Sequence, residues 1–169
     1  AGHFDRLAAA WSKGQTRAEA YLSLSRFLAR VRCGHTYANF FNQSKAVSTE
    51  LFAGRDKLPF HFRWIDGRMI VTDGKGVEGL QRGDEIAAIN GRSAADILRS
   101  LMSFTRADGG NDAKRVAQLN VIGLERFETF DVFNALLYPA GDTFVLAVRA
   151  ARDGAARTIT TAPITLEQR

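Results

Sequence analysis

The sequence contains one cysteine, Cys33, among its 169 residues. A single cysteine excludes an internal disulfide and a zinc site built from several cysteines, and it leaves the redox compartment open. Histidine is also scarce, and His3, His35 and His61 lack the spacing of metal ligands. No apolar run reaches the roughly 18 residues that a membrane helix requires. We therefore expect no cofactor, no metal ion and no membrane segment in this chain.

Charge of one sign is not concentrated anywhere. The 23 basic and 18 acidic residues are scattered, and their sum is a net charge of +5. This distribution does not indicate a nucleic-acid or membrane surface, so we expect no nucleic-acid partner. The length and the hydrophobic content of 46% suit a globular protein of one domain or two small ones. Because Ala1-Gly2-His3 is neither an initiator start nor a signal peptide, we expect a piece of a longer polypeptide.

The first third of the chain reads as helical. Residues 4–11 have helical spacing, and Thr16-Arg17-Ala18-Glu19 is a capping box that opens a second helix. Gly34 is placed to stop this helix, whose apolar stripe consists of Ala20, Tyr21, Leu24, Phe27, Leu28 and Val31. Residues 35–41 are rich in β-branched and aromatic side chains and favour an extended segment. Residues 48–52 can form one helical turn.

Strand patterns dominate the middle of the chain and return at its end. Alternating runs at 60–65 and 68–72, separated by Asp66-Gly67, predict a β-hairpin with a tight turn. A capping sequence at Ser93 begins a helix over residues 94–104, and further helices are predicted at 112–122 and 125–137. Two β-rich runs, 143–150 and 157–161, flank a turn and can pair as antiparallel strands.

The most specific pattern is the stretch from Leu80 to Gly91. Gly83 can supply a positive φ before a short apolar strand, residues 86–89, that is suited to burial on both faces. Asn90-Gly91 then provides a strong two-residue turn signal. The order Leu80, Gly83-Asp84, Ile86, Ile89-Asn90-Gly91, followed by a helix, resembles a stretch of PDZ and PDZ-like domains. The predicted fold class is α+β, with a helical N-terminal segment and a PDZ-like, partly open β-barrel with flanking helices.

Three motifs in one order extend this resemblance. Cys33-Gly34-His35-Thr36-Tyr37, Leu58-Pro59-Phe60 and the Gly83-to-Gly91 turn resemble the amino-terminal half of the tail-specific, or carboxyl-terminal-processing, serine peptidases, including their tricorn-like branch. The resemblance covers residues 16–125. It implies a helical segment over 1–57, a PDZ-like module over 58–125, and a helix with a closing hairpin over 126–169. In that family the nucleophilic Ser lies in an α/β core beyond this region.

The resemblance therefore implies a substrate-recognition region that is inactive by itself. Its partners would be a polypeptide substrate or a protein C-terminus, and the catalytic domain of the same polypeptide. An extracytoplasmic location, periplasmic or secreted, is implied by the same resemblance. Two other functions stay open: a stand-alone PDZ-like adaptor that binds peptides, and a structural scaffold domain. A downstream core with a nucleophilic Ser would favour the peptidase over the adaptor.

His35 is the candidate catalytic residue. It follows a helix stop and precedes the expected extended segment, a junction from which a side chain can project. The tricorn-like resemblance implies that His35 is the base that takes a proton from the missing Ser. Members of the other branch use a Lys as the base, and His35 can also be a structural residue bonded within a turn. Cys33 is read as a buried, inert thiol rather than a nucleophile.

A peptide-binding groove is the second candidate site. The resemblance places the strand that lines it at Leu58, Pro59, Phe60 and Phe62, and the opposite wall at Ile97 and Leu101 of the next helix. A ligand strand would add to this edge through main-chain hydrogen bonds. Pro59, however, stands where the family has a glycine and offers no N–H to a carboxylate. The alternative is an ordinary start of an edge strand.

Overall fold

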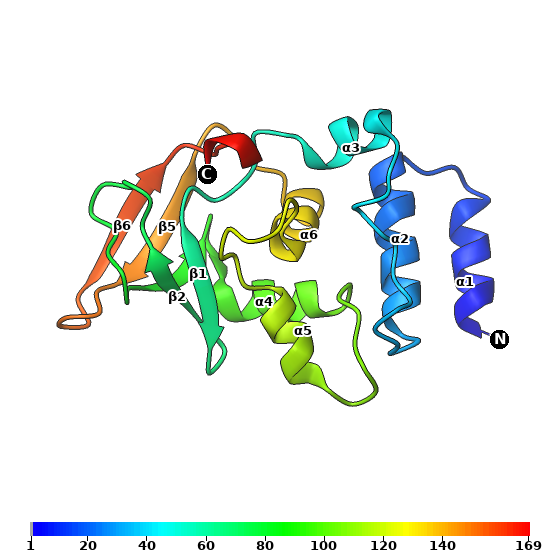
Figure 1. Cartoon of the computed structure of the whole chain (residues 1–169), viewed down its shortest axis with the longest axis horizontal. Helices are drawn as coiled ribbons and strands as arrows, with labels where there is room; N and C mark the ends of the chain where they lie inside the picture. Colours follow the sequence, from blue (N-terminus) through cyan, green and yellow to red (C-terminus); the bar gives the residue numbers. More distant parts are fainter. Residues whose placement is uncertain (1) are drawn as a thin grey trace.

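The structure is a computed structural model that describes residues 2–169. A β-sheet occupies one side of the molecule and the N-terminal helices the other, with α6 between them (Figure 1). The elements, in chain order, are α1 (Gly2–Trp11), α2 (Arg17–Ala29), α3 (Lys45–Phe52), β1 (His61–Ile65), β2 (Arg68–Asp73), β3 (Glu85–Ile89), β4 (Arg92–Ser93), α4 (Ala94–Met102), α5 (Asp112–Gln118), α6 (Thr129–Leu137), β5 (Phe144–Arg149), β6 (Ala156–Thr161) and the 3-10 turn η1 (Leu166–Gln168).

All strand pairs of the six-stranded sheet are antiparallel. The strand order is β1-β2-β3-β5-β6, and the short β4 pairs with β3. Beyond the two outer strands, Lys57 and Ile164 form an isolated bridge that brings the two edges of the sheet together. The sheet thus curls without closing, and the predicted α+β class with a partly open barrel is confirmed.

The predicted hairpin is the β1–β2 pair. Asp66 and Gly67 have φ values of 49° and 74°, as a two-residue turn of type I′ requires. Phe62 and Trp64 alternate with exposed neighbours and face the core, where the Phe62 ring meets Phe130 of α6 at 4.9 Å between centroids. The alternation of residues that predicted the hairpin therefore corresponds to side chains that point in turn toward the core and toward the surface.

The Leu80-to-Gly91 stretch forms β3 and its flanking turns. Gly83 has a φ of 93°, and Asn90 and Gly91 have φ values of 48° and 76°, so both turns have the expected backbone conformation. Ile86 and Ile89 are buried. The expectation of burial on both faces was wrong, because residues 87 and 88 are only half-buried. The register against β5 shifts between Ile86 and Ala88, which redirects the side chains locally.

The predicted capping box opens α2. The Thr16 side chain accepts from the Glu19 amide, and the Glu19 carboxylate accepts from the Thr16 amide at 2.9 Å. The buried residues of α2 are Tyr21, Ser25 and Ala29, and of these only Tyr21 belonged to the predicted stripe. The helix also ends before Gly34, since the left-handed conformation that follows it is adopted by Arg32, with a φ of 54°.

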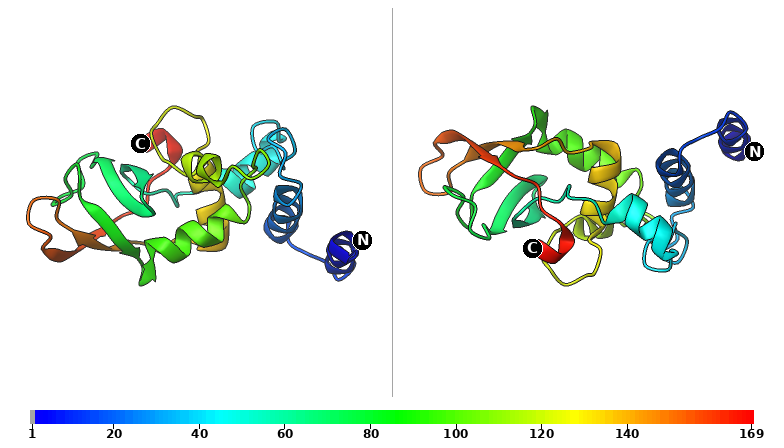
Figure 2. Two further views of the ribbon diagram at one scale, coloured as in Figure 1. Left: turned by 90° about the horizontal axis from the view of Figure 1, so that it is seen from below. Right: turned by 90° about the horizontal axis from the view of Figure 1, so that it is seen from above.

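α1 lies at the periphery, beside α2 and far from the sheet (Figures 1 and 2). The Phe4 ring contacts Phe27 of α2 edge to face, at 6.4 Å between centroids. Phe27 therefore faces α1 rather than the core, which explains why the apolar pattern of α2 misplaced its buried side. Phe4 and Trp11 remain 64% and 47% exposed.

Three further expectations need correction. Residues 35–41 are irregular and form no strand, because no neighbouring strand offers them a hydrogen-bonding edge. The helix predicted over 112–122 ends at Gln118, since residues 119–121 instead cross the edge of β1. The helix predicted from Glu125 begins at Thr129.

One hydrophobic core joins residues from all parts of the chain, including Tyr21, Phe52, Phe62, Phe133 and Phe144. The division at residues 57/58 and 125/126 stays a prediction. Across residues 2–169, no helix combines the length and the apolarity that crossing a bilayer requires.

Candidate functional site: the His35 turn and the adjoining cavity

His35 lies in a turn of the irregular segment that follows α2. The turn is closed by a hydrogen bond from the Thr36 amide to the Cys33 carbonyl, at 3.1 Å. The His35 side chain is exposed, and neither ring nitrogen bonds to any residue in the range 2–169. Both nitrogens therefore remain available to a group that approaches from outside.

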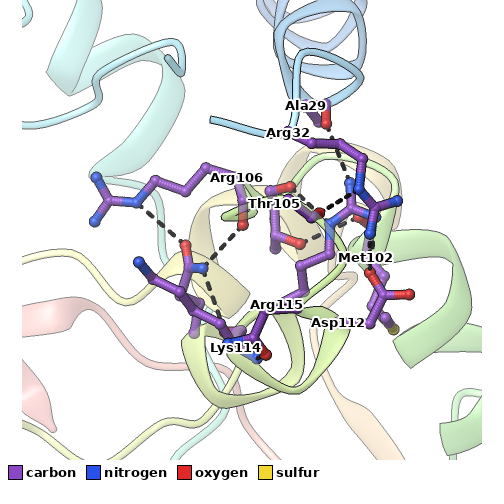
Figure 3. Close-up of polar contacts among 11 residues, drawn as sticks. Ala29, Arg32, Met102, Thr105, Arg106, Asp112, Lys114 and Arg115 are labelled. Carbon is purple, nitrogen blue, oxygen red and sulfur yellow. Dashed lines mark hydrogen bonds and ion pairs between the residues drawn. The ribbon is translucent and has the colours of Figure 1, made fainter. Parts of the chain in front are cut away.

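Hydrogen bonds from two arginines hold the end of α2 against the α4–α5 loop (Figure 3). Arg115 donates to the Ala29 carbonyl at 3.3 Å and to the Thr105 carbonyl at 3.2 Å. Arg32 donates to the Asp112 carboxylate at 2.8 Å, and its carbonyl accepts from the Gly109 amide at the same distance. These contacts fix the segment immediately before the His35 turn.

The turn itself rests on the same loop. Arg106 donates to the Gly34 carbonyl at 3.3 Å, and its guanidinium lies 4.2 Å from the centre of the Tyr37 ring. Gly34 also approaches Asp108 so closely that a Cβ would stand 2.1 Å from Oδ1. Asp108 pairs with Lys114, whose hydrogen bond lowers the pKa of that carboxyl. Contacts with the α4–α5 loop thus hold the turn, while the His35 side chain itself is exposed.

Cys33 is half-exposed, so the expectation of a buried thiol was wrong. Hydrogen bonds from the His35 amide and from the Thr36 side chain lower the pKa of the Cys33 thiol. The tight turn causes this, because it directs the amide that follows toward the sulfur.

All six residues predicted to line a peptide groove are buried: Leu58, Pro59, Phe60, Phe62, Ile97 and Leu101. The chain itself occupies the β1 edge that a ligand strand would need. Phe62 and Val121 exchange two backbone hydrogen bonds, at 2.9 and 3.1 Å. The Trp64 amide donates to the Asn120 side chain at 2.8 Å. These residues therefore meet in the core rather than in an open groove, and binding there stays a prediction that requires residues 119–121 to move.

An open cavity of about 240 Å³ lies beside the His35 turn instead. Tyr37 and Arg106, which contact the turn, also line the cavity. The remaining walls come from α2, α5, α6, the α4–α5 loop and the loops before α3 and α6. They include Phe40, Phe41, Phe104, Phe127 and Phe133. Sequence reasoning missed this cavity because its walls come from segments far apart in the chain. The only local sequence feature that belongs to the cavity is the group of aromatic residues within 37–41.

The described residues, 2–169, contain no group of three or more His, Cys, Asp or Glu side chains placed to hold a metal ion. The polar side chains that line the cavity include those of Arg106, Gln118, Glu125 and Glu128. Glu128 is occupied, because one of its carboxylate oxygens accepts from the amides of Ile122 and Gly123 at 3.1 and 2.7 Å.

The fold is similar to part of two solved structures of CPAF, a serine protease that resembles the tail-specific proteases. For a mutant of CPAF the TM-score is 0.57 at 14% identity, over 95% of this chain and 27% of that chain. For mature CPAF the TM-score and identity are the same, over 95% and 28%. This chain thus spans little more than a quarter of the CPAF chains, and the likeness is one of fold. No protein-family model matches the sequence, and no curated protein matches it.

Proposed function

We propose that this chain is the amino-terminal, substrate-recognition region of a serine peptidase of the tail-specific family, with a PDZ-like module over residues 58–125. The observation that carries the proposal is the fold likeness to CPAF along 95% of the chain. The motif order in the sequence supports the same family independently. In this proposal the nucleophilic Ser lies outside the chain, which is therefore inactive alone, works on polypeptides and docks on its own catalytic domain. An extracytoplasmic location belongs to the same proposal.

His35 is the proposed general base for that Ser. A base must present a free nitrogen to the hydroxyl and must be held firmly while it does so. The exposed ring with two unbonded nitrogens meets the first requirement. The second is met by Arg106, which bonds to Gly34 directly before His35. A structural histidine in a turn would instead use a ring nitrogen to bond to its own chain.

A stand-alone adaptor is less well supported. β-strand addition needs an exposed strand edge, and Asn120 and Val121 cover this edge of β1. A purely structural scaffold would not need an exposed histidine beside an open aromatic cavity. Both alternatives remain as outcomes of the experiment that follows.

The test is peptide hydrolysis by the full-length polypeptide that contains this chain. We expect His35→Ala to lower kcat by about 10²- to 10⁴-fold, the usual contribution of a general base, with little change in the unfolding midpoint. His3→Ala, at another exposed histidine, serves as the matched control and should retain full activity.

Unchanged turnover in His35→Ala would show that the base lies elsewhere and would favour a Ser-Lys arrangement. Unfolding of that variant would show that His35 is structural. The absence of a nucleophilic Ser from the full-length polypeptide would favour the adaptor.

A further inference from the structure

Another cavity, of about 290 Å³, lies where β3, β4 and α4 meet the end of α6 and the start of β5. Its inner wall is apolar and includes Ile89, Ile97 and Phe144, all of them buried. Asn90 and Arg92 also line the cavity and are exposed, so it opens to solvent on their side. Its volume is close to the lower end of the roughly 300–1,000 Å³ that ligand sites commonly have.

One buried polar side chain in this cavity has no hydrogen-bond partner. Asn134 of α6 lines the cavity and is 5% exposed, and its amide group bonds to no residue in the range 2–169. Both the oxygen and the nitrogen of this amide remain accessible to solvent, so an atom in the cavity can reach them. Asparagine is a poor helix former, and buried polar groups are normally paired with protein, water or a ligand. Asn134 therefore marks a polar position inside a largely apolar cavity.

Arg92 of β4 reaches the same cavity. Its guanidinium carbon lies 4.2 Å from the centre of the Tyr138 ring, and this contact positions the cation at the end of α6. Tyr138 follows Asn134 by about one helical turn, and its amide donates to the Asn134 carbonyl at 2.8 Å. The guanidinium forms no hydrogen bond or ion pair within residues 2–169. Its donors are therefore free, close to the Asn134 amide.

The other polar groups favour an anion. Asn90 uses its side-chain oxygen to accept from the Val145 amide at 2.8 Å, which leaves its NH2 group to donate. No acidic residue within the range 2–169 lines the cavity, so nothing in the lining compensates the charge of Arg92. A single guanidinium matches the single charge and the planar shape of a carboxylate. The apolar inner wall suits an alkyl group attached to that carboxylate.

We propose that this cavity binds an aliphatic carboxylate. Arg92 and the NH2 group of Asn134 donate to the carboxylate, and the alkyl group packs against the apolar inner wall. A free carboxylic acid presents this chemistry, and so does the C-terminal residue of a polypeptide when its side chain is aliphatic. The site belongs to this chain alone and does not depend on the proposed peptidase function.

The first experiment is titration of the ¹⁵N-labelled 169-residue chain with 4-methylpentanoate and with its neutral analogue 4-methylpentanamide, followed by NMR. We expect the acid to bind about tenfold more tightly or better, as a hydrogen-bonded charge pair provides. The signals of the Asn134 side-chain NH2 group should shift on addition of the acid. They report contact at the cavity directly and independently of any hydrolysis.

Arg92→Met tests the cation. The variant keeps an unbranched apolar side chain at an exposed position, so it should fold normally, and it should lower the affinity for the acid about tenfold or more. The acid and the amide should then bind alike. Arg63→Met is the matched control, because Arg63 is also an exposed strand arginine without a bonded partner in residues 2–169, and it does not line the cavity. It should bind the acid as the parent does.

Asn134→Ala tests the buried amide. We expect the affinity for the acid to fall about three- to tenfold, as the loss of one hydrogen bond predicts. The unfolding midpoint should change little, because the substitution breaks no hydrogen bond of the chain and alanine favours the helix. Should this variant nevertheless fail to fold, Arg92→Met still decides the proposal.

A peptide with an aliphatic C-terminus, acetyl-Ala-Ala-Leu, distinguishes the two sources of the carboxylate. Binding about tenfold tighter than that of 4-methylpentanoate would identify a polypeptide C-terminus, and equal or weaker binding a free acid. Three results would overturn the proposal: no binding of either acid at millimolar concentration, equal affinity for 4-methylpentanoate and its amide, or an unchanged affinity in Arg92→Met. Loss of hydrolysis in His35→Ala, or its absence, leaves all of these measurements unaffected.

Discussion

Arg169 donates hydrogen bonds to both carboxylate oxygens of Asp131, and neither side chain is more than 5% exposed. Arg169 also donates to the Leu58 carbonyl at 3.2 Å. One arginine thus connects α6, the segment that leads into β1, and the turn η1. Burial raises the pKa of Asp131, while the nearby guanidinium opposes that rise.

We expect Arg169→Ala to lower the free energy of unfolding by about 3–5 kcal/mol at pH 7, because it leaves a buried carboxylate uncompensated. The loss should shrink as the pH falls, since protonation of Asp131 removes the unpaired charge. Urea denaturation measures both effects. Arg152→Ala is the control, because Arg152 is exposed and bonds to nothing within residues 2–169, and it should change stability by no more than about 0.5 kcal/mol. Equal losses in the two variants would contradict this account.

The buried carboxylate of Asp84 explains why an aspartate follows Gly83 in the stretch from Leu80 to Gly91. Its carboxylate is 1% exposed and accepts from the amides of Gln81 and Ala151 at 2.8 and 3.0 Å, and from Arg157. We expect Asp84→Ala to cost about 2–4 kcal/mol in urea denaturation, because buried donors lose their acceptor. The expected loss is smaller than that for Arg169→Ala because the Arg157 side chain is one-third exposed.

Asp153→Ala provides the comparison for Asp84. Asp153 likewise accepts from a backbone amide, that of Ala155, but it lies in an exposed turn. We expect a loss of less than about 1 kcal/mol, since water replaces the lost acceptor. A loss as large as that of Asp84→Ala would show that burial of the carboxylate is not the cause.

His61 should make stability depend on pH. Its ring packs against Gly123, where a Cβ would lie 2.6 Å from Cε1, and its Nε2 has no hydrogen-bond partner among residues 2–169. Burial, followed by the charges of Lys75 and Arg169, lowers the pKa of His61 below 6.5. The unfolded chain therefore takes up the proton first, so stability should fall as the pH drops below about 6.5.

Denaturation midpoints between pH 5 and 7 test this expectation. The slope should decrease in His61→Gln, and added salt should reduce only the part that comes from the neighbouring charges. An unchanged slope in His61→Gln would assign the pH dependence to other groups.

The Cys33 thiol should react faster with iodoacetamide at pH 7 in the folded chain than in urea. The turn lowers its pKa and so increases the thiolate fraction, and the side chain is half-exposed. Thr36→Val removes one of the hydrogen bonds to sulfur and should slow the reaction while the fold is kept. A folded chain that reacts more slowly than the unfolded one would contradict the prediction.

Local patterns in the sequence predicted those features that depend on neighbouring residues. The hairpin around Asp66-Gly67, the capping box at Thr16 and the turns at Gly83 and Asn90 all form as predicted, because each depends on backbone conformations and hydrogen bonds within a few residues. The prediction for α2 was less successful. Its apolar residues face either the core or α1, and periodicity alone does not separate two packing partners.

The candidate sites depended on long-range contacts. The sequence by itself determined the α+β class and indicated His35 as a candidate residue. The hydrogen bond from Arg106 to Gly34, which holds the His35 turn, joins residues 72 positions apart and depends on the tertiary structure. Tertiary structure alone decided that the expected groove is filled, because Asn120 and Val121 reach the β1 edge from a distant segment. It also created the aromatic cavity beside the His35 turn from segments that are far apart in the chain. No local pattern encodes which strand edge is covered or which side chains enclose a space, since both depend on how distant segments pack.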